Sequence, residues 1–344
     1  MKIPRIAFIF AACMILATSL PARADKGSVS PGMVRFSEDS QRAIIMFNGN
    51  EELLILATEL KAEKETGVLE FIPFPSNPAV KAAPDDTFKK AEELIRNKKI
   101  ATLDLASISK GGGKETTPVE LLLSEKIGLH DITVIKINDI SEFTKWAESY
   151  FAKKKISVTN DLSGFYGNAK DYVSRGISYF VIDYVTLKEE KKTIEPLAYR
   201  FKTDKIYYPL KTSNVVGGEG EIDLVFIIPG SFKSEQRESF LDSGDFYYAP
   251  YINLSESLRF SMEISNSAPV TYADANKIYP GAAKFFKGIK QLYLQAMTYY
   301  GPYKFSDDLL YDPAKLDPRA FVWDSLGGTY PWETQYYLKP VENK

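Results

Sequence analysis

Histidine, cysteine, paired serine and lysine, and carboxylate groups are the side chains with which this chain could catalyse a reaction or bind a metal. His130 is the only histidine and Cys13 the only cysteine among 344 residues. Zinc, copper and iron sites usually take two or more histidine or cysteine ligands. The sequence therefore predicts no such centre and no cofactor. It also lacks the G-x-S-x-G nucleophile motif, so we expect His130 to be a surface or capping histidine.

A serine and a lysine are spaced as in one class of hydrolase. Ser107 and Lys110 form an S-x-x-K pattern, and Lys211-Thr212-Ser213 loosely resembles K-T-G. Serine enzymes that act on penicillin or peptidoglycan use such patterns, and their lysine activates the serine. No S-D-N stands between the two patterns here, and Lys110 opens the glycine-rich segment 110–118. Ordinary loop residues are the simpler interpretation, and the hydrolase stays open as an alternative.

Carboxylates offer a second chemistry. Glu219, Glu221 and Asp223 alternate along an expected strand, so their side chains share one face. Three carboxylates on one face could bind Ca²⁺, which prefers oxygen ligands. A solvated strand end is the simpler interpretation. A glycosidase needs only two suitably spaced carboxylates, and the 45 acidic residues do not indicate which two these would be.

The C-terminal region is rich in aromatic rings. The segment 240–344 holds 22 of the 45 aromatic residues. Exposed tryptophan and tyrosine rings stack on sugars or on extended peptides, so a binding face is one interpretation. The other is that the rings pack the C-terminus onto a sheet. The candidate binding face consists of Trp323, Tyr330, Trp332, Tyr336 and Tyr337.

The N-terminus has the pattern of a secretory signal peptide. Lys2 and Arg5 precede an apolar run over 6–20, and Ala22-Arg23-Ala24 supplies small residues for cleavage before Asp25. Cys13 lies inside this segment, so the mature chain is expected to be cysteine-free.

Segment 1–24 also carries three of the 43 basic residues and no acidic one, which leaves 40 basic and 45 acidic residues and a net charge of −5. An acidic chain does not favour nucleic acid as a partner, and no later apolar run reaches spanning length. The expected location is therefore periplasmic or secreted, with no membrane span after cleavage.

Hydrophobic patterning indicates the elements that must position these groups. It predicts an α+β fold: a largely antiparallel or mixed β-sheet with a helical insertion and a C-terminal aromatic-rich α/β extension. The expected strands cover 42–48, 52–60, 68–74, 119–123, 131–137, 177–187, 194–201, 205–210, 222–229 and 258–264, and the expected helices 85–98, 140–154, 160–175 and 281–300.

Three details of this prediction are specific enough to be tested. Asn48-Gly49-Asn50 indicates a tight β-hairpin, and 68–74 is expected to continue the same sheet. Segment 177–187 is apolar on both alternations, which is typical of a central strand covered on both faces. The predicted organisation is a signal peptide over 1–24, an α+β domain over 25–238 and an aromatic-rich region over 239–344 packed on the first.

A series of loose apolar patterns resembles the bacterial family called domain of unknown function 2330. The patterns run in order over about 25–230 and comprise Ser40-Gln41-Arg42-Ala43-Ile44-Ile45, Asn48-Gly49, Leu53-Leu54-Ile55, Phe71-Ile72-Pro73-Phe74-Pro75-Ser76, Gly128-Leu129-His130-Asp131-Ile132, Trp146, Asp171-Tyr172-Val173, Pro196-Leu197, Phe201 and Tyr208-Pro209-Leu210. Some relatives open with a cysteine pair that this chain lacks, which speaks against a redox or disulfide role here. The resemblance implies an exported bacterial protein, and it assigns no activity and no site residues.

The sequence is compatible with two functions. The favoured one is a non-catalytic binding or structural module of the cell envelope, with a cell-envelope glycan or another envelope protein as its partner. The alternative is an envelope hydrolase that uses paired carboxylates or the Ser107–Lys110 pair. A deep site around the serine and lysine, or paired buried acids, would favour the enzyme.

Overall fold

The computed structural model describes residues 28, 31, 36–62, 65–101, 123–187, 192–193, 195–215, 219–240, 246–253, 261–326 and 335–342. The predicted signal peptide with its cleavage residues, Ser107, Lys110, Tyr330 and Trp332 lie outside these residues.

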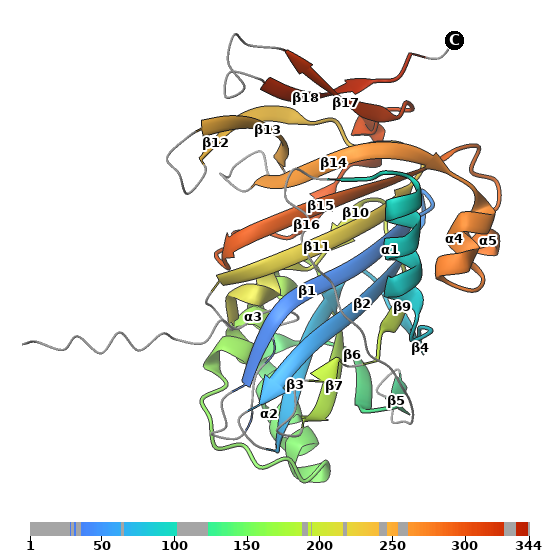
Figure 1. Cartoon of the computed structure of the whole chain (residues 1–344). Helices are drawn as coiled ribbons and strands as arrows, with labels where there is room; N and C mark the ends of the chain where they lie inside the picture. The colour runs from blue at the N-terminus through green and yellow to red at the C-terminus, as the bar shows by residue number, and fades with distance from the viewer. Residues whose placement is uncertain are drawn as a thin grey trace, which may run out of the picture.

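Two β-sheets form the centre of the described structure (Figure 1). The larger is mixed, because β1 and β11 are parallel and every other pair is antiparallel. Its strands are, in order, β12 (Glu235–Phe240), β13 (Phe246–Asn253), β14 (Ser261–Val270), β15 (Leu292–Pro302), β11 (Glu219–Ile228), β1 (Phe36–Phe47), β2 (Glu51–Ala62), β9 (Leu197–Lys202) and β4 (Ala79–Ala82), with β8 (Lys192–Thr193) paired to β2.

The smaller sheet is antiparallel throughout. Its order is β3 (Thr66–Phe74), β7 (Tyr179–Leu187), β6 (His130–Lys136) and β5 (Leu123–Ile127). Two short strand pairs are not paired with a strand of either sheet: β10 (Ile206–Tyr208) with β16 (Leu309–Tyr311), and β17 (Phe321–Leu326) with β18 (Gln335–Pro340).

Helices cover the outer face of each sheet. The α-helices are α1 (Thr87–Asn97), α2 (Ile140–Lys153), α3 (Ser163–Ser174), α4 (Tyr272–Ile278) and α5 (Ala282–Phe285), and the 3-10 helices are η1 (Leu210–Val215) and η2 (Pro313–Lys315). Leu94 of α1 and Ile278 of α4 share an apolar cluster with Ile55 of the larger sheet. On the smaller sheet, the ring centroid of Phe71 lies 6.0 Å from that of Phe143 in α2 and 4.7 Å from that of Phe165 in α3.

The inner faces of the two sheets pack against each other. Phe74 at the end of β3 contacts Tyr199 and Phe201 of β9, with ring centroids 5.1 Å apart in both pairs. One buried apolar cluster contains residues of both inner faces. The described chain therefore has four layers, in the order helix, larger sheet, smaller sheet and helix.

The predicted hairpin is present between β1 and β2. Gly49 adopts a φ of +96°, which glycine reaches without strain. The side-chain oxygen of Asn48 accepts hydrogen bonds from the backbone N–H groups of Asn50 and Glu51, at 3.1 and 2.9 Å. The strands then pair antiparallel from Phe47 and Glu52 onward.

The segment 68–74 forms the predicted strand, but it does not continue the sheet of β1 and β2. It lies in β3, at the edge of the smaller sheet. An apolar run indicates burial and gives no information on which sheet a strand joins. The edge position also explains why Pro73 is tolerated opposite Phe180. An edge strand has a neighbour on one side only, here β7, so β3 need not donate backbone N–H groups on its other side.

The predicted helix over 281–300 is wrong. Only Ala282–Phe285 is helical, and Gly288, at a φ of +101°, precedes the strand Leu292–Pro302. This strand, β15, lies between β14 and β11 and has buried side chains on both faces, among them Leu294 and Met297. A strand covered on both faces shows no alternation, so its apolar residues also fit a helical stripe.

The predicted α+β class with a mixed sheet is confirmed, and α2 and α3 form a helical insertion between β6 and β7. The expected central strand is β7, which pairs with β3 on one side and β6 on the other.

Because β15 hydrogen-bonds to β11, residues on both sides of the predicted boundary at 238 share one sheet. In the described residues, no helix combines the length and the apolar character that a membrane span requires.

A buried carboxylate–histidine cluster as candidate functional site

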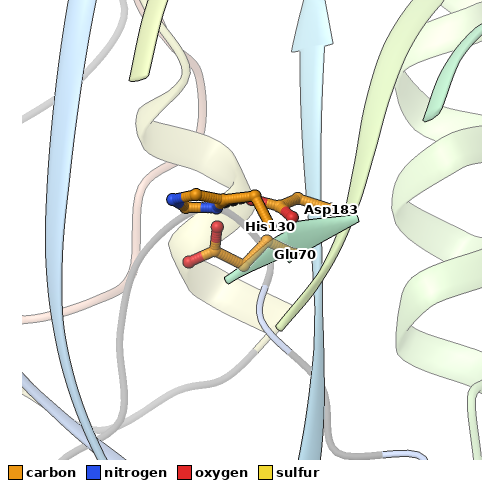
Figure 2. A group of neighbouring side chains, drawn as sticks. All are labelled: Glu70, His130 and Asp183. Atoms are coloured by element: carbon orange, nitrogen blue, oxygen red, sulfur yellow. Dashed lines mark hydrogen bonds and ion pairs between the residues drawn. The ribbon is translucent and has the colours of Figure 1, made fainter. Parts of the chain in front are cut away.

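Glu70, His130 and Asp183 form what we call the buried cluster, and three neighbouring strands position them (Figure 2). Glu70 on β3 stands directly opposite Asp183 on β7. His130 opens β6 opposite Val185, two residues after Asp183. Because residues two apart on a strand and directly opposed residues point to the same side, all three side chains project from one face of the smaller sheet.

That face is the inner one, which packs on the larger sheet. Phe74 follows Glu70 by four residues on the same side of β3 and contacts β9 of the larger sheet. Glu70 and Asp183 are each 0% exposed and His130 is 1% exposed. Ionisable side chains are rarely buried to this extent unless they are paired, so the cluster must satisfy most of its polar atoms internally.

Both ring nitrogens of His130 face oxygen atoms. Nδ1 lies against Oδ2 of Asp183, and Nε2 lies 2.9 Å from the backbone carbonyl oxygen of Glu195. A carbonyl oxygen only accepts, so Nε2 carries a proton and donates it. When no other cation is present, a second proton must lie between Nδ1 and Asp183, on one atom or the other. The Nε2 bond also joins the smaller sheet to the segment that leads into β9 of the larger sheet.

Negative charge exceeds positive charge in the buried cluster. Two carboxylates face one imidazole, and Oδ1 of Asp183 is a buried oxygen with no hydrogen-bond partner among the described residues. Burying an uncompensated carboxylate is costly. A proton or a metal cation bound among the three side chains would offset this negative charge. One oxygen or nitrogen atom from each of the three residues lies within 4.8 Å of the others.

The expectation that His130 is a surface or capping histidine is wrong. The residue does begin a strand, but its side chain is buried between the sheets. No sequence pattern indicated the cluster, because its members are separated by 60 and 53 residues and the two acids stand between apolar or aromatic residues. Only the pairing of β3, β7 and β6 brings them together.

A second polar network lies between α3, η1 and the segment before β16. The carboxylate of Asp308, with its side chain 0% exposed, accepts hydrogen bonds from the Tyr172 hydroxyl at 2.5 Å and the Lys211 backbone N–H at 3.0 Å. Nη1 of Arg175 lies 3.3 Å from the same carboxylate. Burial outweighs these partners and raises the pKa of Asp308 to about 6.

The charged rim of this network is partly exposed. Arg175 also forms ion pairs with Asp307 at 2.6 Å and with Asp171 at 2.9 Å. The Nζ of Lys211 lies 2.9 Å from Asp171. Although partial burial acts to raise it, the pKa of Asp171 is lowered by the combined effect of Lys211 and Arg175.

The residues of the possible K-T-G pattern lie in η1, and each has a partner elsewhere in the fold. The hydroxyl of Thr212 donates to the Pro209 carbonyl at 2.6 Å, and that of Ser213 accepts from the Gln41 side chain at 3.3 Å. The side chain of Lys211 points to Asp171, as described above. The partner motif, Ser107 with Lys110, lies outside the described residues.

The three alternating acids of β11 do not all point to solvent. Asp223 accepts a hydrogen bond from the Thr298 hydroxyl at 2.9 Å and stands opposite Arg42 on β1. Burial raises the pKa of Asp223, and the Thr298 bond and the charge of Arg42 offset part of that effect. Glu219 at the strand end is exposed, so only this part fits the expected solvated strand end.

Trp323 and Tyr337 of the aromatic tail have side-chain partners within the chain. Trp323 is partly buried against the main apolar cluster, and its indole N–H donates to the Ala101 carbonyl at 3.1 Å. The Tyr337 hydroxyl donates to Asp324 at 3.2 Å. Tyr336 lies opposite Ser325 in the β17–β18 pair. Packing of the C-terminus therefore accounts for Trp323 and Tyr337.

Comparison with known proteins finds no matching family model and no matching curated protein, so membership in the family called domain of unknown function 2330 stays a prediction. Among solved structures, the crystal structure of baculovirus P35 matches 81% of this chain and 97% of that chain, with 10% sequence identity and a TM-score of 0.38. A likeness at that TM-score carries no inference about this chain.

Proposed function

We propose that this protein is an exported bacterial module of the cell envelope with a binding or structural role and no catalytic activity. The observation that carries the non-catalytic part is the closure of the buried cluster. Its histidine and two carboxylates are the residue types that general acid–base catalysis uses, yet they are at most 1% exposed. A substrate must approach such groups to within hydrogen-bond distance, and the packed sheets leave almost none of their surface exposed.

The N-terminal sequence supports the export part of the proposal. A basic start, an apolar run and the Ala22-Arg23-Ala24 site together are typical of a signal peptide. The exported partner would be a cell-envelope glycan or another envelope protein. The partly buried state of Trp323 favours a mainly structural role for the C-terminal rings over a fully open aromatic binding face.

Export is tested by the intact mass of the protein in a periplasmic extract of a bacterium that expresses the full chain. The expected mass corresponds to a chain that begins at Asp25. A mass that still includes 1–24 would contradict export by cleavage. In-cell cross-linking of the exported protein, followed by separate analysis of glycan and protein adducts, identifies the class of partner.

The absence of catalysis is tested on purified peptidoglycan. The mature protein should bind or ignore this polymer and release no soluble fragments from it. Release of fragments that is abolished by Ser107→Ala would overturn the proposal and establish the serine–lysine hydrolase instead. Release that persists in Ser107→Ala would point to a carboxylate mechanism elsewhere in the chain.

A further inference from the structure

We propose that the buried cluster is a binding site for one divalent metal cation, Zn²⁺ by the chemistry of its ligands. The ligands are Nδ1 of His130 and one carboxylate oxygen each from Glu70 and Asp183. This inference concerns the interior of the fold and does not depend on whether the protein is exported or catalytic.

The geometry of the three strands supports the proposal. The candidate ligand atoms lie within 4.8 Å of one another. Bonds of about 2.0–2.2 Å from a central zinc ion place its ligand atoms at most about 4 Å apart, so small rotations of the side chains suffice. Adjacent, hydrogen-bonded strands fix the three Cα positions, which means that a cation would meet an arrangement already formed by folding.

The orientation of His130 is the second observation. Nε2 donates to the Glu195 carbonyl at 2.9 Å, which leaves Nδ1 directed at the carboxylate of Asp183. Histidines that bind metals almost always donate their other ring N–H to a carboxylate or a backbone carbonyl, because that bond fixes the tautomer and the plane of the ring. The Glu195 carbonyl supplies this bond here.

The charge of the cluster is the third observation. Counted over these three side chains alone, two carboxylates stand beside one neutral imidazole, a charge of −2 that a divalent cation would match. Asp183 also has a buried oxygen, Oδ1, with no hydrogen-bond partner in the described part of the chain. This oxygen is available as a fourth donor if the Asp183 carboxylate binds through both oxygens.

The small number of protein ligands decides which cation fits. Ca²⁺ takes six to eight oxygen ligands, and Mg²⁺ usually keeps several of its waters. Among the described residues the buried cluster offers one nitrogen and two or three carboxylate oxygens, which meets neither requirement. Zn²⁺ is commonly four-coordinate and accepts histidine together with aspartate or glutamate.

The cation would replace the proton between His130 and Asp183. In that exchange the N–H or O–H bond breaks, the proton leaves to solvent, and Nδ1 and the carboxylates donate electron pairs to Zn²⁺. No electron is transferred, so neither an oxidant nor a reductant is needed. The alternative occupant is the proton alone, and the experiment must distinguish the two.

The first measurement uses the full chain without a histidine tag. The protein is unfolded in denaturant with a chelator, because a buried ion does not exchange freely, and is refolded either with Zn²⁺ or with the chelator. We expect one zinc per chain by native mass spectrometry after refolding with zinc, and a denaturation midpoint clearly above that of the chelator sample. Failure to retain zinc, with identical midpoints in both samples, would overturn the proposal.

The second measurement uses near-isosteric variants. Asp183→Asn and Glu70→Gln each remove one charged ligand, and we expect each to weaken zinc binding by about 100-fold or more, because loss of a group that only supports a ligand already costs about 10–100-fold. Glu52→Gln is the matched control. Glu52 is also 0% exposed and lies on the inner face of the larger sheet, but it accepts its hydrogen bond from the Tyr207 backbone N–H and is not part of the cluster.

The control should retain one zinc per chain and the zinc-dependent midpoint. Zinc that is retained equally by all three variants would place the ion elsewhere and overturn the assignment. If a ligand variant does not fold, the wild-type comparison of zinc against chelator still decides the question, because it requires no substitution.

Discussion

The buried carboxyl of Asp308 should make the free energy of unfolding fall as the pH rises from about 4.5 to about 7.5. Its side chain is fully buried beside Tyr172, Arg175 and the Lys211 backbone, and burial raises its pKa to about 6. In the unfolded chain an aspartate has a pKa of about 3.9. The folded protein therefore holds the proton over a pH range in which the unfolded chain has released it.

The sign and size of the effect follow from this difference. Between the two pKa values the folded state binds more protons than the unfolded state, so the free energy of unfolding decreases with pH. The difference of about two pKa units corresponds to about 3 kcal/mol over the full range. Between about pH 4.5 and about pH 7.5 the expected loss is about 2 kcal/mol, because the upper part of the transition lies in that window.

Urea unfolding of the wild type and of Asp308→Asn across this range measures the effect. Asparagine has nearly the same shape, and its side-chain oxygen can accept from the Tyr172 hydroxyl or the Lys211 N–H. Subtracting the variant's free energy of unfolding from that of the wild type removes most contributions of other titrating groups. Asp171 is one of these, and its lowered pKa acts in the opposite direction. We expect wild-type stability minus variant stability to fall by about 2 kcal/mol as the pH rises.

Tyr172→Phe provides a directional check. The Tyr172 hydroxyl donates to the Asp308 carboxylate and thereby lowers the pKa of that group. Its removal should raise the pKa of Asp308 further and move the loss of stability to higher pH. A wild-type-minus-Asp308→Asn difference that stays constant within about 0.5 kcal/mol, or that grows with pH, would refute the reasoning.

Three further predictions concern packing. Phe71→Ala should cost about 3–5 kcal/mol in urea unfolding, because its ring lies 4.4 Å from that of Phe180 and joins the smaller sheet to its helices. Leu294→Ala, in the buried first half of β15, should cost about 2–5 kcal/mol in urea unfolding. Tyr300→Ala, at a 77% exposed position later on the same strand, should change stability far less by the same assay. A chain that ends at Phe240 lacks β15 and should be insoluble or partly unfolded, while the full chain melts in one calorimetric transition; a soluble truncated chain with an unchanged melting temperature would contradict this.

Local signals predicted those parts of the fold that depend on neighbouring residues. Asn48-Gly49 predicted the first hairpin because its geometry depends on the backbone freedom and the side-chain bond of these two residues. The helix predicted over 140–154 is α2, and the Asp139 side chain at its start accepts from the Ser141 N–H at 2.8 Å. Apolar runs also predicted β7 and β11, because a buried strand needs apolar side chains in its own sequence.

Long-range pairing was not predictable in the same way. The apolar run of β3 is compatible with either sheet, and its neighbour β7 follows only after the α2–α3 insertion. The stripe over 281–300 matched a helix because β15 is buried on both faces and so has no alternation. In both cases the decisive information is the identity of the partner strand, which lies far away in the sequence.

The candidate site could not be predicted from the sequence for the same reason, because its residues come from distant strands. Counting histidines excluded a metal centre on the ground that one such ligand is too few, yet β3 and β7 place two carboxylates beside that one ligand. The count addressed composition, whereas coordination depends on which side chains share a face of the sheet. Neither Glu70 nor Asp183 had a distinguishing feature among 45 acidic residues.

The occupant of the buried cluster determines how its residues should respond to neutralisation. If a shared proton is the only occupant, Asp183→Asn leaves both ring nitrogens of His130 hydrogen-bonded, because an amide N–H donates to Nδ1 while Nε2 still donates to the Glu195 carbonyl. The effect of the substitution on stability is then the same with zinc as with a chelator, since no cation is bound in either case. If a cation is the occupant, the same substitution removes a ligand and the protein loses the free energy of metal binding. The zinc dependence of the stability change at Asp183 therefore separates a structural proton from a structural metal, and Glu70→Gln must show the same dependence, because both carboxylates would bind the same cation.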